Sequence, residues 1–170
     1  MTPMTLSTAF EWLESTALAV AIQESLYGFA VVVGIHILGL TLSVGTLLWV
    51  DLRLLGLTLR GVSVSQVYRG LAPWFAVGFA MMFASGAVLF TAYATPAWAN
   101  VFFRLKMLAL VLAGANALAL HFLGGRRQAA WDAAPRPPGP VRIAGLVSIL
   151  LWMTVIVAGR MMSYTMFSAP

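Results

Sequence analysis

Four stretches of about twenty or more mostly apolar residues follow one another along this chain, and charged residues are concentrated between them. A helix needs about 20 apolar residues to cross the hydrocarbon core of a bilayer. The 170-residue chain is 61% hydrophobic and 9% charged, whereas soluble domains average about 25% charged residues. So little charge cannot cover a folded surface in water. We therefore expect an all-α fold: an integral membrane four-helix bundle in contact with the lipid bilayer.

The whole chain, residues 1–170, is expected to form a single transmembrane domain. A short interfacial helix is expected over residues 8–20, because Thr8 and Glu11 have the spacing of a capping box and apolar and acidic residues are mixed there. The four spans are predicted at about 26–50, 73–93, 101–123 and 141–162. The loops 51–72 and 124–140 then join the first span to the second and the third to the fourth.

Arginines are concentrated in these two loops and their flanks, namely Arg53, Arg60, Arg69, Arg126, Arg127, Arg136 and Arg142. The opposite side carries Arg104, Lys106 and Arg160 together with Glu11, Glu14 and Glu24. The positive-inside rule places the arginine-rich loops in the cytoplasm. Both termini are therefore expected on the periplasmic side of a bacterial inner membrane. Because topology accounts for the net charge of +5, we expect no nucleic-acid partner.

Several kinds of chemistry are excluded by the residues present. The chain has no cysteine, which rules out disulfides, Fe–S clusters and thiolate zinc sites. The sequence shows no serine–histidine–acid set, phosphate-binding loop or paired carboxylates, so it carries no hydrolase or transferase signature. If the protein takes part in catalysis, we expect it to do so as a redox subunit.

Small and weakly polar residues recur at helical spacing in each span, which is typical of helix contacts in membranes. The predicted inward-facing stripes are Val32, His36, Gly39, Ser43 and Thr46 in the first span; Gly70, Trp74, Gly78, Met81 and Ser85 in the second; Lys106, Ala109, Ala113 and Asn116 in the third; and Ser148, Trp152, Val155 and Gly159 in the fourth. These stripes are expected to be the packing seams of the bundle.

His36 is the strongest candidate for a functional group. It lies roughly 15 Å inside the first span, on the inward stripe. An isolated polar group in hydrocarbon costs several kcal/mol, so this imidazole needs a hydrogen-bond partner, a metal or a proton pathway. One interpretation is an axial ligand to a b-type haem, with Gly39 and Ser43 leaving room for the flat macrocycle. The other is a histidine hydrogen-bonded to a carbonyl or hydroxyl group across the bundle.

Lys106 is the only lysine, and its predicted depth is within about one helical turn of that of His36. No carboxylate is expected inside a span to pair with it. Its partner is expected to be Glu24, an acidic group of a cofactor such as a haem propionate, or lipid headgroups reached by snorkelling. Arg160 offers a second anion contact with the same snorkelling alternative. Trp74, Trp152 and Asn116 complete the predicted cofactor surroundings.

The second histidine, His121, lies near the inner end of the third span. The rise per residue separates it from His36 by roughly 19 Å along the bundle, whereas two axial nitrogens of one iron lie only about 4 Å apart. His121 is therefore assigned to the membrane interface, with a second metal site as the weaker alternative. The sixth ligand of a haem at His36 is left open among Met81, Met82, Met107 and Lys106.

Two short motifs in this chain resemble segments of known bacterial membrane proteins. Ile35-His36, followed by Gly39, Ser43, Gly45 and Leu52-Arg53, is similar to the histidine-bearing helix of CopD-like and HemJ-like bacterial membrane proteins. Phe103-Arg104-Leu105-Lys106, with Asn116 and His121 further along, looks like a later helix of those proteins. The whole chain resembles most a bacterial family of four-helix membrane proteins of unknown function.

The HemJ-like resemblance implies a haem-binding histidine at His36 and a functional lysine at Lys106. HemJ-like proteins are similar to protoporphyrinogen oxidases, and CopD-like proteins to copper-import or copper-resistance factors. This chain lacks the aromatic and basic surroundings of the HemJ histidine helix. For copper import it lacks outer-side methionine or histidine clusters, apart from Met161, Met162 and Met166. Neither the oxidase activity nor the copper-import or copper-resistance activity is therefore assigned to this chain.

Three functions follow, in order of preference. The first is a subunit that binds haem b and passes electrons between quinone or a larger membrane complex and an acceptor. The second is a cofactor-free structural or assembly subunit that packs against other membrane subunits or a copy of itself. The third is a copper or small-solute transporter, ranked last because the internal repeats and broken helices typical of transporters are not evident.

Overall fold

The computed structural model describes residues 6–124, 132 and 136–166. Over these residues all regular secondary structure is helical, which confirms the all-α prediction. The helices are α1 (Leu6–Glu14), α2 (Ala17–Glu24), α3 (Gly28–Leu54), α4 (Val64–Ala92), α5 (Ala94–Ala99), α6 (Val101–Gly124) and α8 (Gly139–Thr165). The predicted loop 124–140 lies mostly outside the described residues.

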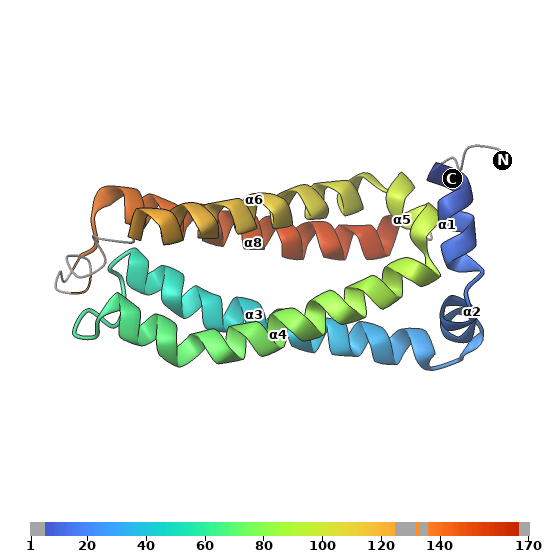
Figure 1. The fold of residues 1–170 in the computed structure, drawn as a ribbon, viewed down its shortest axis with the longest axis horizontal. Coiled ribbons are helices and arrows are strands. Elements are labelled where there is room, and N and C mark those ends of the chain that lie inside the picture. Colours follow the sequence, from blue (N-terminus) through green and yellow to red (C-terminus); the bar gives the residue numbers. More distant parts are fainter. Residues whose placement is uncertain (1–5, 125–131, 133–135, 167–170) are drawn as a thin grey trace.

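Four long helices form two antiparallel hairpins that lie side by side, α3 with α4 and α6 with α8 (Figure 1). All four are long and apolar enough to cross a membrane, so the chain is a multi-pass membrane protein. We call the end of the bundle that carries α1, α2 and α5 the terminal end, and the end that carries residues 55–63 the loop end. The described parts of both chain termini lie at the terminal end (Figure 1). The arginine distribution remains the basis for predicting that the loop end is cytoplasmic.

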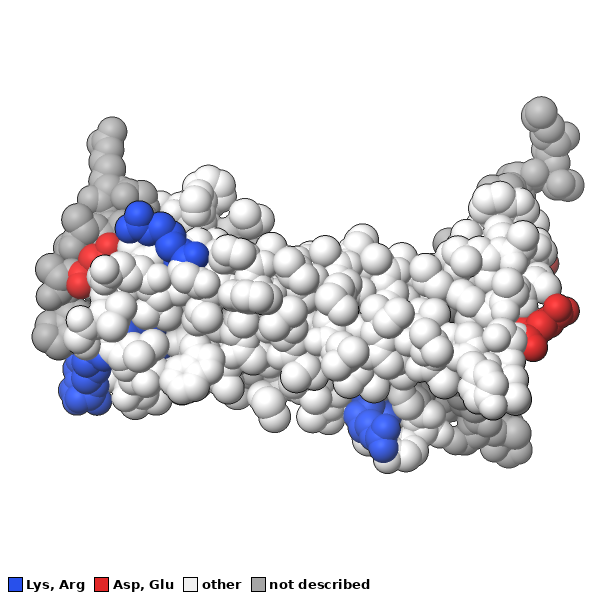
Figure 2. Space-filling view, turned by 90° about the horizontal axis from the view of Figure 1, so that it is seen from below, with Lys and Arg blue, Asp and Glu red and all other residues white. Residues whose placement is uncertain are grey.

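The outer surfaces of the long helices are apolar. Phe83, Val111 and Phe122 are 68%, 66% and 78% exposed, as expected for side chains that face lipid. Figure 2 shows one face of the molecule, on which the broad region between the two ends is largely uncharged apart from a basic group at its lower edge, and the other charged residues lie at the ends. The largely uncharged region of this face therefore corresponds to the part of the molecule that the four apolar helices span.

The α3–α4 hairpin depends on a close approach of two glycines. A Cβ atom added to Gly39 would lie 2.6 Å from the backbone nitrogen of Met82, and one added to Gly78 would lie 2.7 Å from the backbone nitrogen of Ser43. Small residues at such crossings let helix backbones approach each other in membranes. The predicted seam through Gly39, Ser43 and Gly78 is therefore confirmed.

The seam prediction is wrong at the loop-end half of α4. Trp74 is 58% exposed and Gly70 is also exposed. The buried side of this half is formed by Val64 and Val67, with the partly buried Leu71 packed against them. Helix α4 also begins at Val64, well before the predicted start at Pro73, because Ser63 and Gln66 form a capping box there and the helix continues through the proline.

The N-terminal segment forms two short helices where one was predicted. Thr8 is inside α1, so the expected capping box there is wrong, and a break follows at Thr16, whose side chain caps α2. These helices are fastened to the terminal end of the bundle. Glu14 accepts hydrogen bonds from the backbone nitrogen and hydroxyl group of Thr95, and Gln23 donates to the carbonyl group of Ala92.

A matched pair of α3 variants tests the glycine crossing. We expect Gly39→Ala to lower the free energy of unfolding by about 1–3 kcal/mol, since its methyl group would overlap backbone atoms of α4. Gly45→Ala has nothing within 4 Å of the added carbon, and alanine is the better helix former, so it should be neutral or stabilising by up to about 1 kcal/mol. Unfolding of both variants in one detergent is the measurement. Equal stability of the two variants would contradict the crossing.

Candidate functional site

His36 lies in α3 and contacts side chains of two other helices. Its Nδ1 atom is 3.1 Å from the hydroxyl oxygen of Ser85 in α4, and its Nε2 atom is 3.3 Å from Nζ of Lys106 in α6. We call these three residues the His36 centre. The predicted match in depth between His36 and Lys106 is therefore confirmed, and the lysine provides a side-chain link between the two hairpins.

The hydrogen-bond partners indicate which ring nitrogen carries the proton. Lys106 in its charged form has only donors, so it donates to a lone pair on Nε2. The proton of the neutral ring is then on Nδ1, which donates to the Ser85 oxygen or to the Met82 carbonyl group beside the ring. The Ser85 hydroxyl group in turn donates to the carbonyl group of Met81 at 2.6 Å. The donors and acceptors of the His36 centre thus form one consistent chain.

Two glycines leave room around the His36 centre. A Cβ atom added to Gly86 would lie 3.0 Å from Cε1 of His36, so the ring occupies the space that a larger residue would fill. A Cβ atom added to Gly159 in α8 would lie 4.0 Å from the Lys106 side chain, an ordinary van der Waals contact. The His36 ring therefore packs more closely against Gly86 than the Lys106 side chain packs against Gly159.

Three predicted members of a haem pocket must be withdrawn. The space beside Gly39 and Ser43, expected to receive a macrocycle, is filled by the backbone of α4. These two residues are part of a helix crossing instead. Trp74, expected as a pocket wall, is mostly exposed on the outer surface of α4.

None of the contacts described for the other predicted residues involves the side chains of the His36 centre. Arg160 donates to the hydroxyl group of Tyr164 at 2.7 Å and stacks over that ring. Asn116 donates to the carbonyl group of Ala144 and joins α6 to α8. Trp152 is buried in a cluster with Met82 and Val155. His121 is exposed near the loop end of α6, beside the ring of Phe122.

Sequence reasoning missed Asp51. It was assigned to a loop, but α3 continues to Leu54 and buries Asp51 to 3% exposure, so the expectation that no carboxylate lies inside a span is wrong. Arg53, two residues further on, is also buried and donates to the carbonyl group of Val62. Ser148 on α8, which was predicted to face inward, is the hydrogen-bond partner of Asp51.

In the part of the chain that the structure describes, no group of three or more histidine, cysteine or acidic side chains is placed to hold a metal ion. His36 is thus a single imidazole with a lysine as its neighbour. A ligand of this kind can serve as an axial ligand to a metal whose other ligands come from a cofactor.

Comparison with known proteins shows the family. Residues 9–165 match DUF6644, a family of unknown function, and the chain belongs to that family. No curated protein and no solved structure matches the chain. The similarity to CopD-like and HemJ-like proteins therefore stays a resemblance of short motifs.

A double-mutant cycle tests the contact between His36 and Lys106. Removing one partner leaves the other polar group unpaired in the membrane interior, so we expect His36→Leu and Lys106→Met each to cost about 1–3 kcal/mol of unfolding free energy. The double variant should be less destabilised than the sum, with a coupling of about 1 kcal/mol or more. Arg104→Met, whose side chain is exposed, is the matched control and should show no coupling with His36→Leu. Additivity of His36→Leu with Lys106→Met would contradict the contact.

Proposed function

We propose that this protein is a membrane-embedded subunit that binds a b-type haem at His36 and passes electrons to or from quinone or a larger membrane complex. The observation that carries the proposal is the orientation of His36. Its Nδ1 side is held by Ser85 and its Nε2 side is directed towards the second hairpin. Histidines that bind metals are oriented in this way, with one ring nitrogen held by a hydrogen bond and the other presenting its lone pair.

Two nitrogen donors face each other between the hairpins. Two axial nitrogens of one iron lie about 4 Å apart, and Nε2 of His36 and Nζ of Lys106 are already 3.3 Å apart. If a haem bound here, His36 would hold the iron, and Lys106 would lie beside it as a positive charge able to contact a propionate. The flat macrocycle needs a wider space than this contact leaves, because it would lie between the hairpins at the level where Lys106 now contacts His36. Haem binding thus requires the hairpins to part at this level.

A bound haem would supply reversible one-electron chemistry. The role of the chain would be to hold the ligand nitrogen, to fix its tautomer through Ser85 and to place a positive charge beside it through Lys106. Arg160, whose side chain is directed to Tyr164, has no part in this arrangement. The electron partner is proposed only by class, as a lipid-soluble quinone or a neighbouring membrane subunit.

One observation favours a second function, a cofactor-free structural or assembly subunit. Both ring nitrogens of His36 already have partners within the chain. A polar chain of this kind can also specify how two hairpins pair in a membrane, where apolar contacts with lipid and with protein are nearly equivalent. In that case His36 and Lys106 would hold the bundle together and permit association with other subunits or another copy.

The two functions are separated by the haem content of the purified protein. We expect a reduced-minus-oxidised spectrum with a Soret band, either as isolated or after addition of haem, and its loss in His36→Ala. His121→Ala is the matched control, because His121 is exposed and far from the His36 centre, and it should keep the band. A wild-type protein that is folded but takes up no haem would overturn the first proposal and leave the second.

A further inference from the structure

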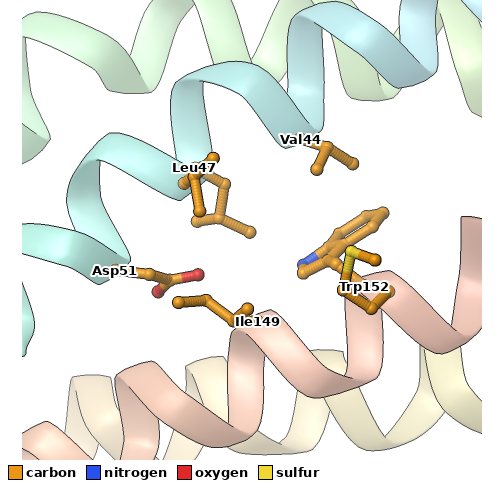
Figure 3. A pocket seen from close by; sticks show the side chains of 7 residues that line it. Val44, Leu47, Asp51, Ile149 and Trp152 are labelled. Atoms are coloured by element: carbon orange, nitrogen blue, oxygen red, sulfur yellow. The ribbon is translucent and has the colours of Figure 1, made fainter.

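We infer that Asp51 is a proton-binding site inside the membrane, reached from the lipid through a hollow between α3 and α8. The hollow is lined by Asp51 and by the apolar residues Val44, Leu47, Leu48, Ile149, Trp152 and Met153. Figure 3 shows the Asp51 carboxyl group and the Trp152 indole ring on two sides of this space, with Ile149 and Leu47 between the helices. The inference is independent of the haem proposal.

The burial of Asp51 is imposed by the packing of α3 against α8. The backbone of α8 comes close at Gly145, where an added Cβ atom would lie 3.1 Å from both the Asp51 carbonyl oxygen and Cβ of Leu54. On the following turn of α8, Ser148 contacts the Asp51 carboxyl group. Asp51 is thereby enclosed and cannot extend its short side chain to the membrane surface as a lysine or arginine could.

Asp51 lacks a positive partner within the described residues. Its hydrogen-bond partner is the neutral Ser148, and no ion pair joins it to a lysine, arginine or histidine described by the structure. On its own helix the nearest basic side chain, Arg53, is directed to the carbonyl group of Val62. From α8 the residues that face it are Gly145, Ser148 and Ile149, all uncharged.

A carboxylate with these neighbours needs a proton or a cation, because an isolated ion in a low-dielectric interior is very costly. A hard metal ion is disfavoured, since Ca²⁺ takes six to eight oxygen ligands and Mg²⁺ about six, whereas the hollow offers one carboxyl group among apolar side chains. A proton requires no further ligands. The neutral acid can donate to the Ser148 hydroxyl group, and this pairing satisfies both polar groups.

The hollow gives the acid an approach from the lipid side. Leu48 and Met153, which line it, are 41% and 52% exposed on the surfaces of α3 and α8. The hollow, of about 60 Å³, therefore opens to the lipid side of α3 and α8 beside Asp51, and a larger lipid-soluble molecule would have to displace its lining side chains to reach the acid. Asp51 lies fifteen positions after His36 on α3, which is roughly 22 Å along the helix, so the two sites are separate.

A hydrophobic carbodiimide tests the inference directly. It reacts with a carboxylic acid by taking the acidic proton on one nitrogen while the carboxyl oxygen bonds to its central carbon, and the adduct rearranges to a stable N-acylurea. With the full chain in phospholipid vesicles at neutral pH, we expect dicyclohexylcarbodiimide to label Asp51 several-fold more than the exposed residues Glu11 and Glu24. A water-soluble carbodiimide should reverse this preference. Peptide mass spectrometry is the readout.

Two tryptophan variants test the approach through the hollow. Met153→Trp would fill the opening of the hollow to the lipid and should slow the labelling of Asp51 several-fold. Leu146→Trp is the matched control, because Leu146 is exposed on the same helix and does not line the hollow, and it should leave the rate unchanged. Asp51→Asn should lose the adduct. The inference is overturned if Asp51 of the folded protein is unlabelled while the denatured protein is labelled, or if both reagents label it equally.

Discussion

A polar group inside a bilayer must find its partner within the protein, since lipid tails offer neither donor nor acceptor. This constraint governs the interior of the bundle. His36 satisfies it by contacting one residue on its own hairpin and one on the other. Apolar side chains hold helices together only weakly in lipid. The contact between His36 and Lys106 is therefore a specific link between α3–α4 and α6–α8 at the terminal-end half.

The loop-end half of the bundle is held differently. There the two hairpins meet through the close approach of Gly145 to Asp51 and Leu54 and through the contact of Ser148 with the Asp51 side chain. Each half thus contains ionisable groups that packing of apolar side chains does not explain: His36 and Lys106 in the terminal-end half, and Asp51 and Arg53 in the loop-end half. We infer that the His36 centre carries the proposed redox function, and that Asp51 provides a separate group able to take up a proton.

The sequence predicted the features that follow from composition and helical period. The four long apolar stretches indicated four spans, and a depth for Lys106 within about one helical turn of that of His36 followed from the rise per residue. Ser85 was placed on an inward face, but its partner could not be predicted because helix rotation is set by tertiary packing. Trp74 was misassigned because the buried face of α4 passes through Val67 and Leu71. Asp51 was missed because an acidic residue two positions before an arginine at the end of an apolar stretch is typical of a loop. Only the packing of α8 against α3 reveals that Asp51 is buried.

The central claim is that Lys106 donates to Nε2 of His36 in the haem-free protein, and nitrogen NMR on that protein in lipid tests it most directly. Lys106 is the only lysine, so ¹⁵N-lysine labelling gives a single side-chain signal. With ¹⁵N-histidine as well, we predict a dipolar contact between that signal and a neutral His36 ring protonated at Nδ1. His121→Ala would leave one histidine to observe. A His36 ring protonated at Nε2 and lacking contact with the lysine would contradict the account.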